Sequence, residues 1–289
     1  MQVLVNGITN GLQFALLGVA LALVYRTTRV LHLALGGVAA LTPFAASMLC
    51  SLRLPFLAAG FIAALAAGAL SLTIGVLNHA RLERRGASEA AHVVSSLGIL
   101  IALTQGISFC WSDRVRVLPI RLNAGLTVLG VTVSNSQLFG SLLALALLLA
   151  YLILLRGTRL GWELQAVAED ATGVALLGTS VGRVRNAAYL LSGGFAATGA
   201  LSIASESGFD ARRGLGLMVF AMSAMIVGGP GLSWRPAAGG LVLGLVREFV
   251  SAWAGARWKE PVTFALIVVA LLLRRRQLET GVFDPGLGR

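Results

Sequence analysis

Long apolar runs alternate with short polar connections along the whole chain. Runs of about 20 apolar residues are long enough to cross a bilayer as helices, and a backbone in lipid has to form its hydrogen bonds within its own segment. The pattern predicts an all-α, polytopic transmembrane helical bundle of about 8–10 spans, because the last three runs are short or rich in glycine. The nine runs are Val3–Tyr25, Val30–Leu49, Leu54–Leu77, Ala90–Trp111, Gln137–Leu155, Val184–Ala204, Leu215–Val227, Ala237–Ala254 and Pro261–Leu273.

One connection, residues 112–136, follows a two-residue alternation instead. Apolar residues recur there at Leu126, Val128, Val131 and Val133, with Asn123, Gly125 and Gly130 as turn residues. This pattern predicts a short external β-hairpin-like loop.

Composition agrees with a membrane protein. Of the 289 residues 57% are hydrophobic and only 12% are charged, and the mean hydropathy is +0.84. The net charge of +11 comes from basic residues between the apolar runs, where they flank the membrane and favour lipid over nucleic acid as the partner. We expect residues 1–289 to form a single transmembrane domain.

The arginines of the connections predict the orientation. Alternate connections, which begin with Arg26 and Arg29 and include the one at Arg156, hold more Lys and Arg than the others. Because basic connections stay in the cytoplasm, the N-terminus should lie outside and the C-terminus inside. In this comparison Arg247 is grouped with Arg257 and Lys259 of the connection that follows the eighth run, although it lies within that run.

The longest charged interruption, "RLGWELQAVAEDATGVALLGTSVGRVR", begins at Arg159. Leu160, Leu164 and Val167 recur at helical spacing, Asp170 can cap a second short helix, and Gly178 can end it. The loop 156–183 is therefore predicted to be a cytoplasmic elbow. Such an element suits docking into a groove on a partner, or it rests on the lipid headgroups.

Other single residues leave alternatives open. His32 is either a hydrogen-bonded residue near the inner end of the second span or part of a transport path. Gly228, Gly229 and Gly231 form either a tight turn or a broken helix end that faces a ligand. Cys50 and Cys110 read as small buried hydrophobic residues, although both lie near the outer ends of their spans and a disulfide is conceivable.

Catalytic motifs are absent from the sequence. It contains no G-x-x-x-x-G-K-S/T loop, no HExxH and no GxSxG, and its only lysine is Lys259. Energy for active transport would have to come from a separate subunit or from an ion gradient.

Several motifs, in order, resemble the LivH/LivM-type permeases of branched-chain amino-acid ABC importers. The elbow "TRLGWELQAVAEDATGVALLGT" is similar to that family's "TRLGRAMRAVAQDPEAARLMGI". Three further stretches also match: "GLQFALLGVALALVYRTTRVLHLALGG", "RRGASEAAHVVSSLGILI" and "GGPGLSWRPAAGGLVLG".

The resemblance implies a non-enzymatic permease subunit in the inner (plasma) membrane. Its partners would be ABC ATPase subunits, a second permease subunit and an external solute-binding protein, with ATP bound by the ATPases and no cofactor in this chain. The elbow would be the coupling helix, through Glu169, Asp170, Ala171, Leu176, Leu177 and Gly178. A translocation path would include His32, Gly36, Gly37, Gly228, Gly229 and Gly231.

The chain departs from the family pattern at two places. Leu35 and Gly37 replace the His and Glu of a usual "NFAHGE", and His32 stands where Asn is typical. In the elbow, Ala171 and Thr172 replace a Pro and an acidic residue. These changes leave the substrate and the choice of ATPase open.

Two other function classes would require residues that the apolar runs mostly lack. An ATP-independent secondary transporter or channel usually keeps ionisable groups inside its spans, and the apolar runs hold almost none. An intramembrane enzyme would need a nucleophile, an acid or a metal pair at membrane depth, and none is evident.

Overall fold

The computed structural model describes residues 1–118, 125–128 and 131–277. Every apolar run forms a helix. The elements in order are α1 (Gln2–Thr28), α2 (Ala34–Ser51), α3 (Phe56–Ile74), the π-helical turn η1 (Gly75–His79), α4 (Ala80–Arg84), α5 (Glu89–Trp111), β1 (Gly125–Val128), β2 (Val131–Ser134), α6 (Asn135–Gly157), α7 (Arg159–Glu169), α8 (Ala171–Leu176), α9 (Val181–Ser207), α10 (Arg213–Gly228), α11 (Arg235–Ala254), the 3-10 turn η2 (Ala256–Trp258) and α12 (Lys259–Gln277).

Seven of the described helical stretches are long and apolar enough to cross a membrane. They are α1, α2, the continuous stretch from α3 to α4, α5, α6, α9 and α11. The expected count of 8–10 spans is reached only if further helices are added, beginning with α10, which has 16 residues. The second run also starts later than predicted, because Val30 to Leu33 precede the helix.

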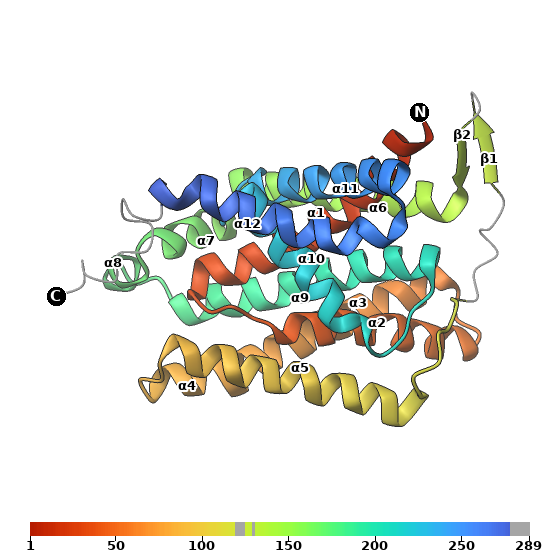
Figure 1. The fold of residues 1–289 in the computed structure, drawn as a ribbon. Helices are drawn as coiled ribbons and strands as arrows, with labels where there is room; N and C mark the ends of the chain where they lie inside the picture. The colour runs from red at the N-terminus through yellow and green to blue at the C-terminus, as the bar shows by residue number, and fades with distance from the viewer. Residues whose placement is uncertain (119–124, 129–130, 278–289) are drawn as a thin grey trace.

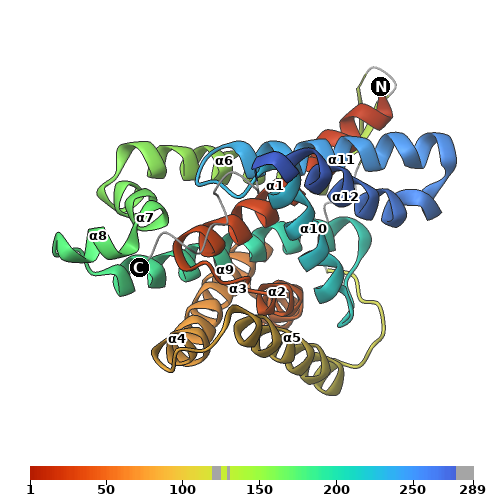
Figure 2. The same ribbon diagram turned by 60° about the vertical axis from the view of Figure 1, so that its left-hand side comes forward.

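Helix α1 runs through the middle of the bundle. It packs against α6, α9, α10 and α11, and most of it is buried. In both views α6, α11 and α12 lie on one side of α1, and α2, α3 and α5 lie on the other (Figure 1, Figure 2). Helices α7 and α8 are at one end, and the N-terminus and the β-strands are at the opposite end (Figure 1).

Small residues set the closest helix contacts. A Cβ atom at Gly7 would lie 3.0 Å from the Cα of Leu245 in α11, and one at Gly11 would lie 2.9 Å from that of Leu241. Gly244 in turn faces the backbone of Gly11. The glycine pairs Gly7/Gly11 and Gly240/Gly244, each four residues apart, therefore lie at the same interface of α1 with α11.

The predicted β-hairpin is confirmed for its described part. Strands β1 and β2 pair antiparallel, with Leu126 opposite Val133, while Asn123 and Gly130 lie outside the described residues. The side chain of Gln2 pairs with the backbone of Thr132, at 2.9 Å from the Thr132 N–H and 3.0 Å to its carbonyl. The hairpin is thus tied to the start of α1.

The two cysteines are free. Cys50 is half-buried and Cys110 is exposed, so the expectation of a buried residue was wrong for Cys110.

We predict that Gly244→Ala lowers the stability of the protein. The added methyl group would overlap the backbone of Gly11, and overpacking of this kind costs about 1–3 kcal/mol. The measurement is the thermal unfolding midpoint of the purified protein in detergent.

Gly106→Ala is the matched control, because a Cβ atom at Gly106 in α5 has no atom within 4 Å. Alanine favours a helix over glycine, so this variant should unfold at the wild-type midpoint or above. Equal midpoints for the two variants would contradict the close contact of α1 with α11.

Candidate functional site

The elbow consists of α7 and α8. Helix α7 starts at Thr158, whose hydroxyl accepts the N–H of Gly161 at 3.1 Å. Its apolar face is buried, with Leu164 at 0% and Val167 at 3% exposure, and it packs against α6, α9 and α1. The apolar stripe predicted from the sequence therefore faces the bundle rather than lipid headgroups.

Polar contacts fix α7 to the spans. The Gln165 side chain donates to the carbonyl of Leu155 in α6 at 2.7 Å. Arg29, just after α1, donates to the carbonyl of Ala168 at 3.2 Å. Gly161 is in contact with the backbone of α6, where any larger residue would overlap it. These contacts predict that α7 moves together with α6 and α1.

Helix α8 begins at the residue that the sequence predicts and ends within one residue of the predicted end. The Asp170 carboxylate accepts the N–H of Thr172 at 3.0 Å and caps the helix. The helix ends at Leu176, one residue earlier than expected, and Gly178 adopts a φ of 84°. Its N–H then donates to the carbonyl of Ala175 at 3.0 Å, an arrangement that glycine makes accessible.

The surface of α8 is apolar where it is most exposed. Leu176 and Leu177 are 86% and 85% exposed, beside the exposed Glu169 and Asp170. A cavity of about 420 Å³ adjoins Leu177, between α7 and the start of α9. Its lining includes the charged residues Arg159, Glu163 and Arg183. The elbow thus presents two leucines next to a polar recess.

His32 lies outside the helices, in the turn that leads into α2. It is fully buried, and its Nδ1 is 3.2 Å from Nε2 of His79. Nδ1 of His79 is in turn 3.3 Å from Nδ1 of His92, so all three histidines of the chain form one series. The sequence offered no signal for this, because they lie in three separate segments.

The other predicted path residues make backbone contacts. Gly36 faces Gly214 at the start of α10, and a Cβ atom at Gly37 would lie 3.0 Å from Leu103. Gly228 and Gly229 end α10, where the N–H of Gly229 donates to the carbonyl of Met225 at 2.7 Å and its φ is 102°.

The predicted path residues therefore form two groups. Gly36 lies against Gly214 near the first turn of α10, and Gly228 is its last residue. At a rise of 1.5 Å per residue these ends of α10 are about 21 Å apart. Gly231 belongs to the second group, since its N–H donates to the Gly229 carbonyl at 2.8 Å.

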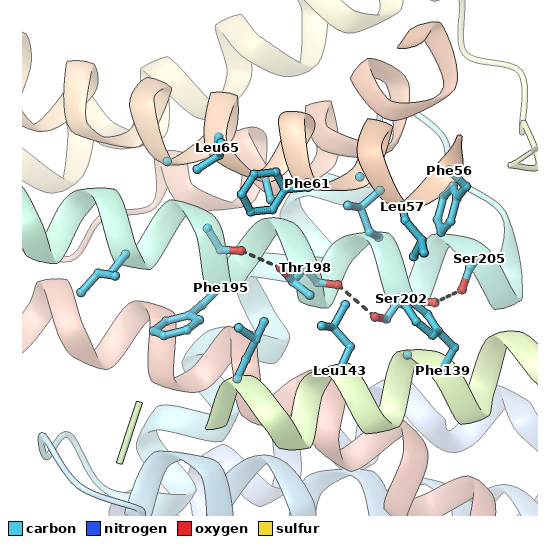
Figure 3. Close-up of a pocket in the computed structure, with 18 of the residues that line it drawn as sticks. Phe56, Leu57, Phe61, Leu65, Phe139, Leu143, Phe195, Thr198, Ser202 and Ser205 are labelled. Atoms are coloured by element: carbon cyan, nitrogen blue, oxygen red, sulfur yellow. Dashed lines mark hydrogen bonds between the residues drawn. The ribbon is translucent and has the colours of Figure 1, made fainter. Parts of the chain in front are cut away.

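A large apolar cavity lies between α3, α6 and α9. It measures about 550 Å³, and aromatic and aliphatic side chains such as Phe61, Phe139 and Phe195 surround it (Figure 3). The hydroxyls of Thr198 and Ser202 point along α9 and donate to carbonyls of their own helix, each at 3.0 Å. The walls therefore suit an apolar occupant, and none of the predicted path residues is among its lining residues.

A second cleft, at the end opposite α8, is polar. Glu206, Arg213, Arg247 and Glu248 are among its lining residues. Arg247, which we counted with a connection, lies within α11 and is 7% exposed. The expectation that the spans hold almost no ionisable groups was wrong at this position, because α11 is one of the helices that can cross a membrane and Arg247 is buried within it.

Comparison with known proteins decides the family. A family model described as "Branched-chain amino acid transport system / permease component" matches residues 3–271. The chain belongs to this family. The permease is thus a membrane-spanning subunit of an ABC-type transport system, as the elbow motif and the spans indicated.

Curated relatives match the permease over most of its length. The branched-chain amino acid transport permease BraD of Pseudomonas aeruginosa is 25% identical over 95% of this chain and 94% of its own. LivH of Escherichia coli K12 is 25% identical over 94% and 93%. The autoinducer 2 import permease LsrC of Salmonella paratyphi B is 34% identical, but over only 47% of this chain and 39% of its own.

A solved structure shares the fold. A chain of "PsaBC from Streptococcus pneumoniae in complex with Fab" has a TM-score of 0.55 and covers 97% of the permease and 95% of that chain, at 13% identity. The arrangement of helices is therefore not particular to close relatives.

We predict that Asp170→Ala loosens α8. Loss of an N-cap typically costs about 1 kcal/mol, so amide exchange within Ala171–Leu176 should accelerate about 5-fold, measured by hydrogen exchange of the purified permease. Asp170→Asn retains a cap and should exchange like the wild type. Similar exchange in all three proteins would show that the cap does not hold α8.

Proposed function

We propose that the permease forms the membrane path of an ATP-driven importer for branched-chain or other hydrophobic amino acids or related small polar solutes. The observation that carries the proposal is the elbow: α7 is anchored to three spans, and α8 presents Leu176 and Leu177 to a partner. The names of BraD and LivH support the substrate class.

The elbow suits the transfer of motion. A partner bound to α8 would displace α7 when it moves. The hydrogen bonds of Gln165 and Arg29 connect α7 to α6 and α1. Packed helices shift as rigid bodies, so closure of the partner would tilt these spans and alternate access to the path. Contact of α8 with lipid alone would transmit no such movement.

The orientation in the membrane follows from the arginines at the end of the molecule that holds the elbow. Arg29 follows α1, Arg85 follows α4 and Arg156 ends α6. Basic connections favour the cytoplasmic side, so the elbow faces the cytoplasm, and the N-terminus and the β-strands face outward. This orientation places α8 where a cytoplasmic ATPase can reach it.

The partners are ABC ATPase subunits, a second permease subunit and an external solute-binding protein. ATP is bound by the ATPases, because the sequence of this chain contains no phosphate-binding loop with a lysine. The solute-binding protein delivers substrate to the end that holds the β-strands. The exposed leucines of α8 receive the ATPase.

We predict that Leu177→Glu lowers ATP-driven uptake at least about tenfold while leaving membrane insertion intact. A carboxylate at this 85% exposed position would need to be desolvated in an apolar interface, which is costly. The measurement is uptake of radiolabelled leucine by right-side-out membrane vesicles that contain the complete transporter and an ATP source in their lumen.

Leu177→Met is the matched control, because it keeps an apolar side chain of similar volume at the same exposed position. It should keep wild-type uptake. Equal uptake by both variants would count against α8 as the coupling element, and uptake that persists without any ATPase but needs an ion gradient would replace the ATP-driven mechanism.

A further inference from the structure

Five helices line the polar cleft at the end opposite α8. It has a volume of about 500 Å³, and its walls come from α1, α9, α10, α11 and α12 together with the α9–α10 connection. Charged side chains of both signs line it, four carboxylates and four cations: Glu206, Asp210, Glu248, Glu260, Arg212, Arg213, Arg247 and Lys259. The lining is therefore neutral overall.

Arg247 is the most buried cation of the cleft. Its guanidinium donates to the carbonyl of Lys259 at 3.2 Å and to the hydroxyl of Thr263. It lies over the ring of Phe220, 4.5 Å from the centroid. These three contacts of the guanidinium do not involve a carboxylate.

The acidic partner of Arg247 is loosely held. Glu260 accepts from the guanidinium at 2.9 Å, but its side chain is 60% exposed. An ion pair with so exposed a partner contributes little stability. The carboxylate of a ligand can replace Glu260 at Arg247, and two parallel N–H groups of arginine fit a carboxylate.

Glu206 differs from the other carboxylates of the cleft. Its partners are amides: Nε2 of Gln13 at 2.5 Å and Nε2 of Gln137 at 3.5 Å. Within the described part of the chain, no cation lies within ion-pair distance of Glu206. A half-buried carboxylate held in position by neutral donors is suited to accept an ammonium group.

The two groups lie around the same turn of α1. Gln13 contacts Glu206, and the neighbouring Phe14 lies under Arg247, whose guanidinium carbon is 5.6 Å from the ring centroid. The rings of Phe14 and Phe220 are 4.7 Å apart. An apolar surface thus lies between the acidic and the basic group, with Ile203 and Leu217 also in the wall.

We propose that this cleft binds the cargo directly, as a zwitterionic α-amino acid with an apolar side chain. Glu206 receives the ammonium group, Arg247 receives the carboxylate in place of Glu260, and the Phe14–Phe220 surface receives the side chain. A neutral lining fits a zwitterion better than a net anion or cation, which would leave one charge uncompensated. This site deepens the proposed function and rests on its substrate class.

Equilibrium binding of radiolabelled L-leucine tests the site. The sample is the purified complex of permeases and ATPases in nanodiscs, without the solute-binding protein. Competition on the wild type comes first and needs no variant: leucinamide lacks the carboxylate and isocaproate lacks the ammonium group. Each should compete at least about tenfold more weakly than leucine, because a hydrogen bond to a charged group is lost.

Two variants of the permease, each in the same complex, should change the affinity for leucine in opposite directions. Glu206→Gln keeps the size of the side chain and should weaken leucine binding about tenfold. Glu260→Gln frees Arg247 and should tighten leucine binding. The control is Glu89→Gln, the same change at an exposed residue of α5 outside the cleft, which should bind like the wild type.

Cargo binding in the cleft is ruled out by any one of three results. The wild type binds no leucine, isocaproate competes as well as leucine, or Glu206→Gln binds leucine as the wild type does. ATP-driven leucine uptake by the complete wild-type transporter separates the two proposals. If the wild-type transporter takes up leucine but Glu206→Gln binds leucine unchanged, only cargo binding in the cleft is rejected. If the wild-type transporter shows no ATP-driven amino-acid uptake, the proposed function is rejected.

Discussion

The close approach of α1 to α11 is the contact on which the rest of the bundle depends. Lipid offers a backbone no hydrogen-bond partner, so each span is a helix, and helices in lipid associate through packing rather than through the hydrophobic effect. Glycines such as Gly11 and Gly244 let the two backbones touch. That contact keeps α1 in the centre, where α6, α9 and α10 also reach it.

The central position of α1 links the two ends of the molecule. Near one end, Gln13 holds Glu206 of α9 in the polar cleft. At the other, Arg29 holds α7 of the elbow, and α9 itself begins just after α8. Under the proposed function, α1 and α9 both contact the cargo site at one end and the elbow that binds the ATPase at the other. A shift of the elbow would therefore alter the cleft without a separate relay.

Local patterns predicted the helices and the elbow, because each depends on residues close together in sequence. Apolar runs set the spans, and Asp170 and Gly178 set the limits of α8 through hydrogen bonds within the loop. Which elements meet is a long-range property that one sequence does not reveal. The histidine series and the pairing of Glu206 with Gln13 join segments far apart in the sequence. The burial of Arg247 likewise depends on Phe220 and Thr263, which belong to other helices.

In the proposed transporter, Leu176 and Leu177 touch an ATPase. The most direct measurement is photocrosslinking in intact membranes from a photoreactive amino acid placed at Leu176. We expect a covalent adduct with a subunit that carries a phosphate-binding loop, and its loss when that subunit is deleted. Adducts with lipid alone, or labelling of position 176 by an impermeant reagent added outside intact cells, would contradict it.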